Sequence, residues 1–268
     1  MMIEDSKFNV EEMKIDIVKY FHIGIPGLTN QIQNETMVLF AGRPAIGKTQ
    51  FLTRIAKGAC INNLKVAYFS LGTSKRQIMK FMAGHALGYS VEQIITSVIS
   101  EEQDPFSSNA NSIYEEFKGS PYEHVFNQCY IFDKIYSSTE IYNVILDLDR
   151  KLKGLDVVII DDLFELTDYS KETVEKILSR FKYCSSFLNI RFIFSTNVDR
   201  RCEHRNDKRP DVYDVKDFEN MHRQFQKIIC LYREKYYNPK AKVDSLELIV
   251  FANCCNEYEE VITIETMF

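Results

Sequence analysis

Residues 37–49 read MVLFAGRPAIGKT, an apolar run that leads into a loop bounded by glycines and closed by Lys48 and Thr49. From Gly42 onward the stretch fits the pattern G-x-x-x-x-G-K-[ST] at every position. Glycines let a backbone curl until its N–H groups point inward at phosphate oxygens. In such a loop Lys48 reaches the β- and γ-phosphates of a nucleotide, and the hydroxyl of Thr49 holds Mg²⁺. The stretch therefore predicts a phosphate-binding loop, or P-loop.

The residues on either side favour a P-loop over a glycine-rich turn without a ligand. Residues 37–41 are typical of a buried strand, and apolar residues recur at helical spacing from Lys48 to about Cys60. A helix that begins at the loop offers the positive end of its dipole to an anion. The predicted nucleotide-binding residues are Gly42, Arg43, Pro44, Ala45, Ile46, Gly47, Lys48, Thr49 and Gln50.

A second apolar run ends in carboxylates. Residues 155–162 read LDVVIIDD, so Asp161 directly follows a strand of buried composition. In P-loop proteins such an aspartate holds Mg²⁺. An aspartate at the end of a strand also begins many turns, but the upstream P-loop favours the metal role. We expect Thr49 and Asp161 to hold Mg²⁺, with Asp162 as the second choice, and Lys48 and Asp161 to be catalytic.

The rest of the chain alternates between strand and helix patterns, which indicates an α/β fold with a mainly parallel central sheet flanked by helices. The last three predicted strands have no helix between them, so we expect antiparallel strands at the C-terminal edge. Residues 101–124 predict a loop with at most one short helix. Helices are predicted at residues 75–99, 137–153 and 170–188. The second of these helices has a capping-box pattern at Ser137 and Glu140 and is closed by Gly154. Further strands are predicted at residues 65–71, 129–132, 157–160, 191–195, 227–231, 246–252 and 261–264.

The predicted domain organisation is simple. Residues 5–20 carry a loose apolar face at helical spacing and predict a helix that docks on this domain or on a neighbouring subunit. Glycine and proline at 24–27 predict a turn before the domain proper. We therefore expect an N-terminal linker or docking helix over residues 1–22 and one domain over residues 23–268.

The composition limits the class of protein. A net charge of −5 over 268 residues excludes a globally basic nucleic-acid binder, but it leaves room for a local basic patch. The seven cysteines are odd in number and show no framework spacing, which is typical of free thiols in a reducing cytoplasm. The acidic N-terminal residues do not resemble a secretory signal. No apolar run approaches the roughly 20 residues that span a bilayer, so we expect no membrane association.

Several stretches together resemble the C-terminal ATPase domain of the DnaB-family replicative DNA helicases. The resemblance covers residues from about 23 to 265 and implies a RecA-like P-loop NTPase fold. It also implies ATP with Mg²⁺, single-stranded DNA in a central channel, a homo-oligomeric ring of usually six subunits, and work in DNA replication beside other replication proteins. The matching stretches are residues 24–29 (GIPGLT), 41–49 with its Gly-Arg-Pro start, 66–71 (VAYFSL), 158–163 (VIIDDL), 199–201 (DRR), 207–210 (DKRP) and 231–234 (LYRE).

The chain departs from the family pattern at positions that matter for hydrolysis. Only about twenty residues stand where the family has an N-terminal helical domain. The second strand of the family ends in Ser-Leu-Glu, and its Glu activates the attacking water, whereas this chain has Gly72 at that position. Glycine offers no base, so we expect weak hydrolysis unless Asp162 or Glu165 substitutes.

Two further family elements are replaced. The family has a Gln after the fifth strand that senses the γ-phosphate, and here Thr196 or Asn197 is the loose counterpart. The family also places a Lys and an Arg finger near the last strands. Residues 251–256 read FANCCN and hold no cation, although Lys235 or Arg233 are candidate replacements.

Residues 197–214 form a basic loop between the fifth and sixth strands. By resemblance this loop faces the DNA in the ring channel, and mobile cations suit the tracking of a single strand. The alternative is a solvated loop balanced by Asp199, Glu203 and Asp207. The candidate DNA-binding residues are Arg200, Arg201, Arg205, Lys208 and Arg209.

Three functional hypotheses follow. The first is an ATP-dependent, DnaB-like helicase subunit that moves on single-stranded DNA. The second is a non-catalytic relative that binds nucleotide and acts as an assembly partner or regulator, which Gly72 favours. The third is another RecA- or KaiC-like ATPase, which leaves the DKRP stretch at residues 207–210 without a role.

Overall fold

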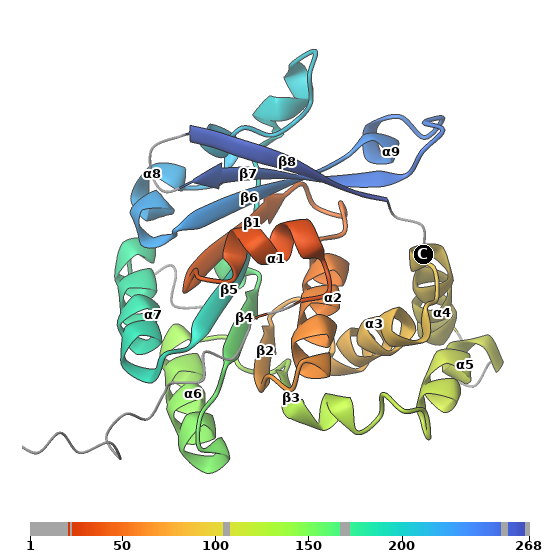
Figure 1. The fold of residues 1–268 in the computed structure, drawn as a ribbon. Helices are drawn as coiled ribbons and strands as arrows, with labels where there is room; N and C mark the ends of the chain where they lie inside the picture. Colours follow the sequence, from red (N-terminus) through yellow and green to blue (C-terminus); the bar gives the residue numbers. More distant parts are fainter. Residues whose placement is uncertain (1–20, 22, 104–107, 167–171, 253–256, 266–268) are drawn as a thin grey trace, which may run out of the picture.

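An eight-stranded sheet forms the centre of the computed structural model, which describes residues 21–265 except residue 22 and residues 104–107, 167–171 and 253–256 (Figure 1). The spatial order of the strands is β3-β2-β4-β5-β1-β6-β7-β8. Neighbours from β3 to β6 pair in parallel, and β7 and β8 are added antiparallel. The predicted sheet with its antiparallel edge is confirmed. The strands are β1 (Met37–Gly42), β2 (Val66–Ser70), β3 (Cys129–Phe132), β4 (Val157–Asp161), β5 (Arg191–Asn197), β6 (Lys227–Arg233), β7 (Ser245–Ala252) and β8 (Glu257–Glu265).

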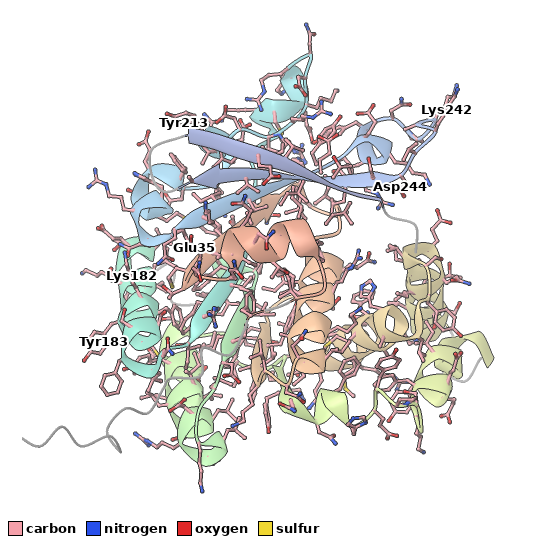
Figure 2. The ribbon with its side chains drawn as sticks, viewed as in Figure 1. Glu35, Lys182, Tyr183, Tyr213, Lys242 and Asp244 are labelled. Carbon is pink, nitrogen blue, oxygen red and sulfur yellow. The ribbon has the colours of Figure 1, made fainter. Side chains whose placement is uncertain are left out.

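Helices cover both faces of the sheet, which is why strands such as β1 and β4 are buried along their whole length. On one face lie α1 (Pro26–Ile32), α2 (Lys48–Ile61) and α3 (Lys75–Leu87). On the other lie α6 (Ser138–Leu152), α7 (Val174–Leu188) and α8 (Phe218–Met221). The outer surface of α7 carries Lys182 and Tyr183, whose side chains point away from the sheet (Figure 2).

A smaller helical group stands beside the sheet next to β3. It consists of α4 (Val91–Gln103) and α5 (Ser108–Phe117), which pack with α3 around a separate apolar core. Helix α9 (Glu234–Tyr237) follows β6 directly, and its Lys235 lies 3.4 Å from Glu92 of α4. None of the described helices is long and apolar enough to cross a membrane.

Several local predictions need correction. The turn expected at residues 24–27 contains the start of α1, where Pro26 occupies a first-turn position that tolerates proline. The loop with at most one short helix expected at residues 101–124 does hold one short helix, α5, although α4 extends to Gln103 at its start. The expected capping box is not formed, because Ser137 precedes α6 without a side-chain capping hydrogen bond. Helix α7 begins at Val174, after Thr173 caps it, rather than near residue 170. The docking helix expected at residues 5–20 lies outside the described residues.

One glycine fixes the approach of the N-terminal segment to α2. A Cβ atom on Gly58 would lie 2.1 Å from the carbonyl oxygen of Ile23. Only glycine permits this contact between a helix and a neighbouring backbone. The segment before α1 therefore packs directly on the helix that follows the P-loop.

Candidate nucleotide-binding site

The P-loop lies at the carboxyl end of β1 and leads into α2. Two positions in it have left-handed backbone angles, with φ of 62° at Ala45 and 108° at Gly47. Gly47 is the residue before α2 and has no side chain that could cap the first helical N–H groups. Those N–H groups have no partner within the helix itself, and an anion bound at this end would accept hydrogen bonds from them.

Parallel pairing brings the other candidate residues to the same edge. Because β1, β4 and β5 run in the same direction, their carboxyl ends meet beside the P-loop. Asp161 is the last residue of β4, and Asn197 is the last residue of β5. The residues that the sequence singled out on three separate segments therefore meet at one site.

Lys48 is the positive centre of this site. Its ammonium donates hydrogen bonds to the carbonyl oxygens of Gly42 at 3.1 Å and Arg43 at 3.3 Å, and to Oδ1 of Asn197 at 2.8 Å. Burial lowers the pKa of Lys48, while the negative charges of Asp162 and Asp161 act in the opposite direction. The hydrogen-bond partners of the ammonium are thus three neutral oxygens, which leaves its charge available to an incoming anion, while a cation such as Mg²⁺ would offset the two nearby carboxylates.

Asp161 is buried, with 5% of its surface exposed, and both its oxygens accept hydrogen bonds. The Tyr68 hydroxyl donates to Oδ2 at 3.0 Å, and the Ser195 hydroxyl donates to Oδ1. Burial and the Asp161 charge raise the pKa of Tyr68, so that hydroxyl stays protonated and remains a donor. Sequence reasoning missed both partners, because only the strand register reveals them.

Asp162 follows Asp161 and begins the short helix η3 (Leu163–Glu165). Its Oδ1 accepts from the backbone N–H of Phe164 at 3.0 Å, and its Oδ2 accepts from Nδ2 of Asn197 at 3.2 Å. Burial raises the pKa of Asp162 to about 6, although the Phe164 N–H and the Lys48 charge lower it. Asn197 thus bridges Asp162 and Lys48.

The two phosphate-sensor candidates lie in different surroundings. Asn197 is half-buried and contacts Lys48 directly. Thr196 has no exposed surface, and within the described chain its hydroxyl has no hydrogen-bond partner. Successive residues of a strand point to opposite faces. The geometry therefore favours Asn197 over Thr196 for contact with a phosphate.

Arg43 ties the P-loop to the basic loop. Its guanidinium donates from Nε to Oε1 of Glu203 at 2.7 Å and from a terminal nitrogen to the carbonyl oxygen of Val198 at 2.8 Å. Glu203 belongs to the short helix η5 (Arg200–His204). Arg43, counted among the nucleotide-binding residues by its place in the motif, is directed toward this helix.

These residues fit a nucleotide with Mg²⁺. The uncapped start of α2 and the Lys48 ammonium suit phosphate oxygens, and the Asp161 carboxylate is the hard oxygen ligand that Mg²⁺ prefers, directly or through water. Thr49, in the first turn of α2, is half-buried beside them. When bound, Mg²⁺ would neutralise charge on the phosphates.

Comparison with known proteins agrees with this geometry. The family described as DnaB-like helicase C terminal domain matches residues 23–263. The chain belongs to this family. A probable plasmid replicative DNA helicase of Chlamydia psittaci is 28% identical over 253 residues, which cover 90% of this chain and 52% of that protein. The chain thus spans about half the length of the curated relatives it matches.

Solved structures show the same fold. One of them, the ATPase domain of another protein, superposes with a TM-score of 0.75 at 22% identity, and the match covers 96% of this chain and 94% of that chain. A DnaB-like replicative helicase, solved in a study of its interactions with primase, gives a TM-score of 0.70 at 23% identity, with 89% of this chain and 59% of that chain covered. The RecA-like fold predicted from sequence is therefore confirmed.

Gly72 stands where the DnaB resemblance predicts the catalytic glutamate. It is exposed, and a Cβ atom added to it would have no atom within 4 Å. The neighbouring N–H of Leu71 donates to the carbonyl oxygen of Asp161 at 2.7 Å, so position 72 borders the candidate Mg²⁺ site. Of the two proposed substitutes, Asp162 has both oxygens engaged, and Glu165 is exposed.

The cations of the basic loop are mostly paired within the chain. Arg201 contacts Asp199 at 3.1 Å, and Arg205 pairs with the buried Asp214. Arg209 makes two hydrogen bonds with Glu247, at 2.6 and 2.7 Å. These pairs agree with the alternative of a charge-balanced loop, so DNA contact here stays a prediction.

The two remaining cations of this loop differ. Lys208 lies 5.6 Å above the ring of Tyr237 and 3.5 Å from the carbonyl oxygen of Glu203. Arg200 is exposed, and its guanidinium makes no hydrogen bond or ion pair within the described residues. Arg200 is thus the member of the loop that is most available to an outside partner.

The candidate replacements for the family finger are also engaged. Arg233 forms a two-pronged ion pair with Asp244, and Lys235 lies 3.4 Å from Glu92 and 3.7 Å from Asp244. Of the stretch expected to carry the finger, residues 253–256 lie outside the described residues.

Proposed function

We propose that this chain is the ATP-binding motor domain of a DnaB-like replicative helicase, which couples ATP and Mg²⁺ to movement on single-stranded DNA. The observation that carries the proposal is the meeting of Lys48 with Asn197, which it contacts, and with the carboxylates of Asp161 and Asp162 at the start of α2. Family membership supports the replicative role, and the names of relatives that are replicative helicases support it further.

In this proposal each residue has a separate task. The N–H groups of the P-loop and the ammonium of Lys48 bind the phosphates. Thr49 and Asp161 hold the metal ion, and Tyr68 and Ser195 fix the orientation of the Asp161 carboxylate. Asn197 reports on the phosphate through its bond to Lys48.

The proposed assembly follows the family. We infer a homo-oligomeric ring, in the family typically a hexamer, that works in the cytoplasm with replication proteins such as primase. The half-length overlap with the curated relatives makes these assignments proposals for this chain. Arg200 and its neighbours in the basic loop are the proposed contacts to single-stranded DNA.

A second candidate is a nucleotide-binding relative that assembles with a helicase without turning over ATP. Gly72 favours it, because no side chain there can activate water, and both oxygens of Asp162 are already engaged. A RecA- or KaiC-like ATPase of another branch is disfavoured by the family match.

ATP binding and hydrolysis, measured on one sample with and without single-stranded DNA, separate the two candidates. Turnover that rises with DNA supports the motor, and tight binding without turnover supports the non-catalytic relative. Lys48→Ala removes the ammonium that meets the β- and γ-phosphates, so we expect its ATP affinity in calorimetry to fall below detection. An unchanged affinity of this variant would refute the P-loop assignment.

A further inference from the structure

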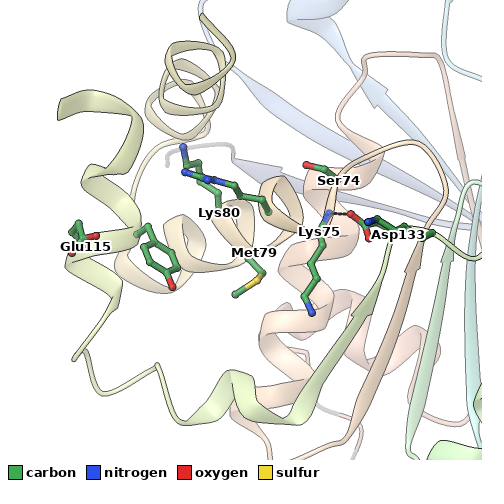
Figure 3. A pocket seen from close by; sticks show the side chains of 9 residues that line it. Ser74, Lys75, Met79, Lys80, Glu115 and Asp133 are labelled. Atoms are coloured by element: carbon green, nitrogen blue, oxygen red, sulfur yellow. Dashed lines mark hydrogen bonds between the residues drawn. The ribbon is translucent and has the colours of Figure 1, made fainter. Parts of the chain in front are cut away.

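A cavity of about 680 Å³ opens between α3, α5 and the residues that follow β3 (Figure 3). It lies beside β3, the outermost strand, and is separated from the P-loop after β1 by β2, β4 and β5. The carboxyl ends of β3 and β1 nevertheless point to the same edge of the sheet. The cavity and the nucleotide site therefore share one edge of the domain.

One hydrogen bond builds the rim of this cavity. The backbone N–H of Lys75, at the start of α3, donates to Oδ2 of Asp133 at 2.7 Å. Asp133 directly follows β3, and Lys134 comes next. The bond thus holds the first residue of α3 against the end of β3 and places Lys75 and Lys134 on the same rim.

The ammonium groups of these two lysines are available. Both residues are exposed, and within the described residues neither ammonium has a hydrogen bond or an ion pair. The Asp133 carboxylate is already engaged by a backbone N–H, and Glu115 is the other carboxylate of the lining. This contrasts with the basic loop, where Arg205 and Arg209 are paired with buried or half-buried carboxylates.

The lining as a whole is positive. Arg76 and Lys80 add two cations, so four positive side chains stand against two negative ones. Lys80 is buried, and its ammonium donates to the carbonyl oxygen of Ser97 at 3.1 Å, which fixes it in the wall. In a chain of net charge −5, a local excess of this sign attracts anions.

The cavity also has an apolar wall. Met79 is 39% exposed and Tyr114 is 48% exposed, and both line the cavity. Lys75 and Met79 are four residues apart on α3 and therefore project from the same side of the helix, as Figure 3 shows. An exposed aromatic ring beside free cations matches sites that bind single-stranded nucleic acid without sequence preference, where bases stack and phosphates pair.

We propose that this cavity binds single-stranded nucleic acid, with Lys75 and Lys134 on the phosphates and Tyr114 stacked on a base. The inference rests on the proposed function, which brings a single strand to this domain, and adds a second contact surface away from the basic loop. An acidic protein segment is the competing occupant, but it would leave the flat face of Tyr114 without a matching group.

The test uses a fluorescently labelled oligo(dT) strand and measures its affinity by anisotropy over a range of salt concentrations. The test variant is Lys75→Glu with Lys134→Glu. The matched control is Lys151→Glu with Lys153→Glu, which makes the same charge change at two exposed residues. These residues lie at the end of α6, which leads into the amino end of β4, whereas the cavity lies at the carboxyl end of β3. ATP affinity is measured on each sample, so failure of the proposed function is seen separately.

We expect the test variant to bind oligo(dT) at least about tenfold more weakly at low salt. The slope of log affinity against log salt concentration should become shallower by roughly 1.4, because two phosphate contacts are lost. The control pair should change the affinity by less than about threefold. Tyr114→Ala should weaken the binding of oligo(dT) about fivefold or more and leave the affinity for an abasic strand unchanged.

Three results would overturn the inference while ATP binding remains intact. The wild-type chain binds no oligo(dT), both charge-reversal pairs weaken binding equally, or neither pair weakens it. Polyglutamate serves as the probe for an acidic protein. If it binds the wild type and loses binding in the test variant, while oligo(dT) binds both alike, the occupant is an acidic protein and not nucleic acid.

Discussion

Restoring a carboxylate at position 72 is the change that most directly tests how this domain handles ATP. A Cβ atom on Gly72 would have no atom within 4 Å, and the backbone there is not in the left-handed region. We therefore expect Gly72→Glu to change the free energy of unfolding by less than about 0.5 kcal/mol. The new side chain would extend beside Asp161, whose carbonyl oxygen accepts from Leu71.

The expected gain in turnover is large. A positioned general base contributes about 10²- to 10⁴-fold, which corresponds to a barrier lower by about 3–5 kcal/mol. The assay is steady-state ATP turnover at saturating ATP, with and without single-stranded DNA. Gly72→Gln is the matched control, because it has the same length and cannot accept the proton.

Two results would refute this reasoning. Equal activation by Gln and Glu would show that bulk at position 72, and not a base, raises the rate. No gain from Glu, in a variant whose ATP affinity and oligomeric state match the wild type, would show that the base lies elsewhere. Asp162 and Glu165 would then be the residues to replace.

Three further predictions concern stability. Asp161→Ala removes the acceptor of two buried hydroxyls, so the free energy of unfolding in urea should fall by about 2–6 kcal/mol; a loss under about 0.5 kcal/mol would contradict the buried network. Gly58→Ala places a Cβ against the Ile23 carbonyl and should cost about 1–3 kcal/mol, whereas Gly72→Ala serves as the control and should cost little. The pKa of His85 is lowered from 6.5 to about 4, chiefly by burial and then by Lys57 and Arg54. As the pH falls from 6.5 to about 4, the unfolded state takes up a proton that the folded state does not, so stability should fall by up to about 3 kcal/mol. His85→Gln should flatten that part of the curve of unfolding free energy against pH, and identical curves would contradict the assignment.

The part of the fold that sequence predicts well is local in origin. The apolar run of β1, the P-loop and the helical spacing of α2 lie within 25 consecutive residues, Met37–Ile61. Helices cover both faces of β4, and a strand buried on both faces has a continuous apolar run, which the sequence of β4 shows directly. The position and type of these elements follow from periodicity. The prediction of Lys48 and Asp161 at one site follows from the P-loop motif together with an apolar strand that ends in a carboxylate.

The details of the site depend on contacts between distant residues. Asp161 receives its hydrogen bonds from Tyr68, 93 residues earlier, and Ser195, 34 residues later. No local pattern marks either partner. The choice between Thr196 and Asn197 likewise required the end of β5, because one step along a strand moves a side chain to the other face. The Ser137 capping box failed for a similar reason, since a pattern allows a hydrogen bond without enforcing it.

The cations of this chain show most clearly that a sequence pattern alone does not locate a binding site. The basic loop carries five cations within ten residues, and density alone favours it as the nucleic-acid contact. Two of its arginines, however, pair with carboxylates: Arg205 with Asp214, and Arg209 with Glu247, which is 38 residues away. Lys75 and Lys134 belong to no charge run, yet a backbone hydrogen bond brings them together, and within the described part of the chain their ammonium groups are unpaired. A cation that already forms an ion pair within the chain is less available to an outside ligand. Whether it forms such a pair depends on the tertiary structure and not on the spacing of charges along the chain.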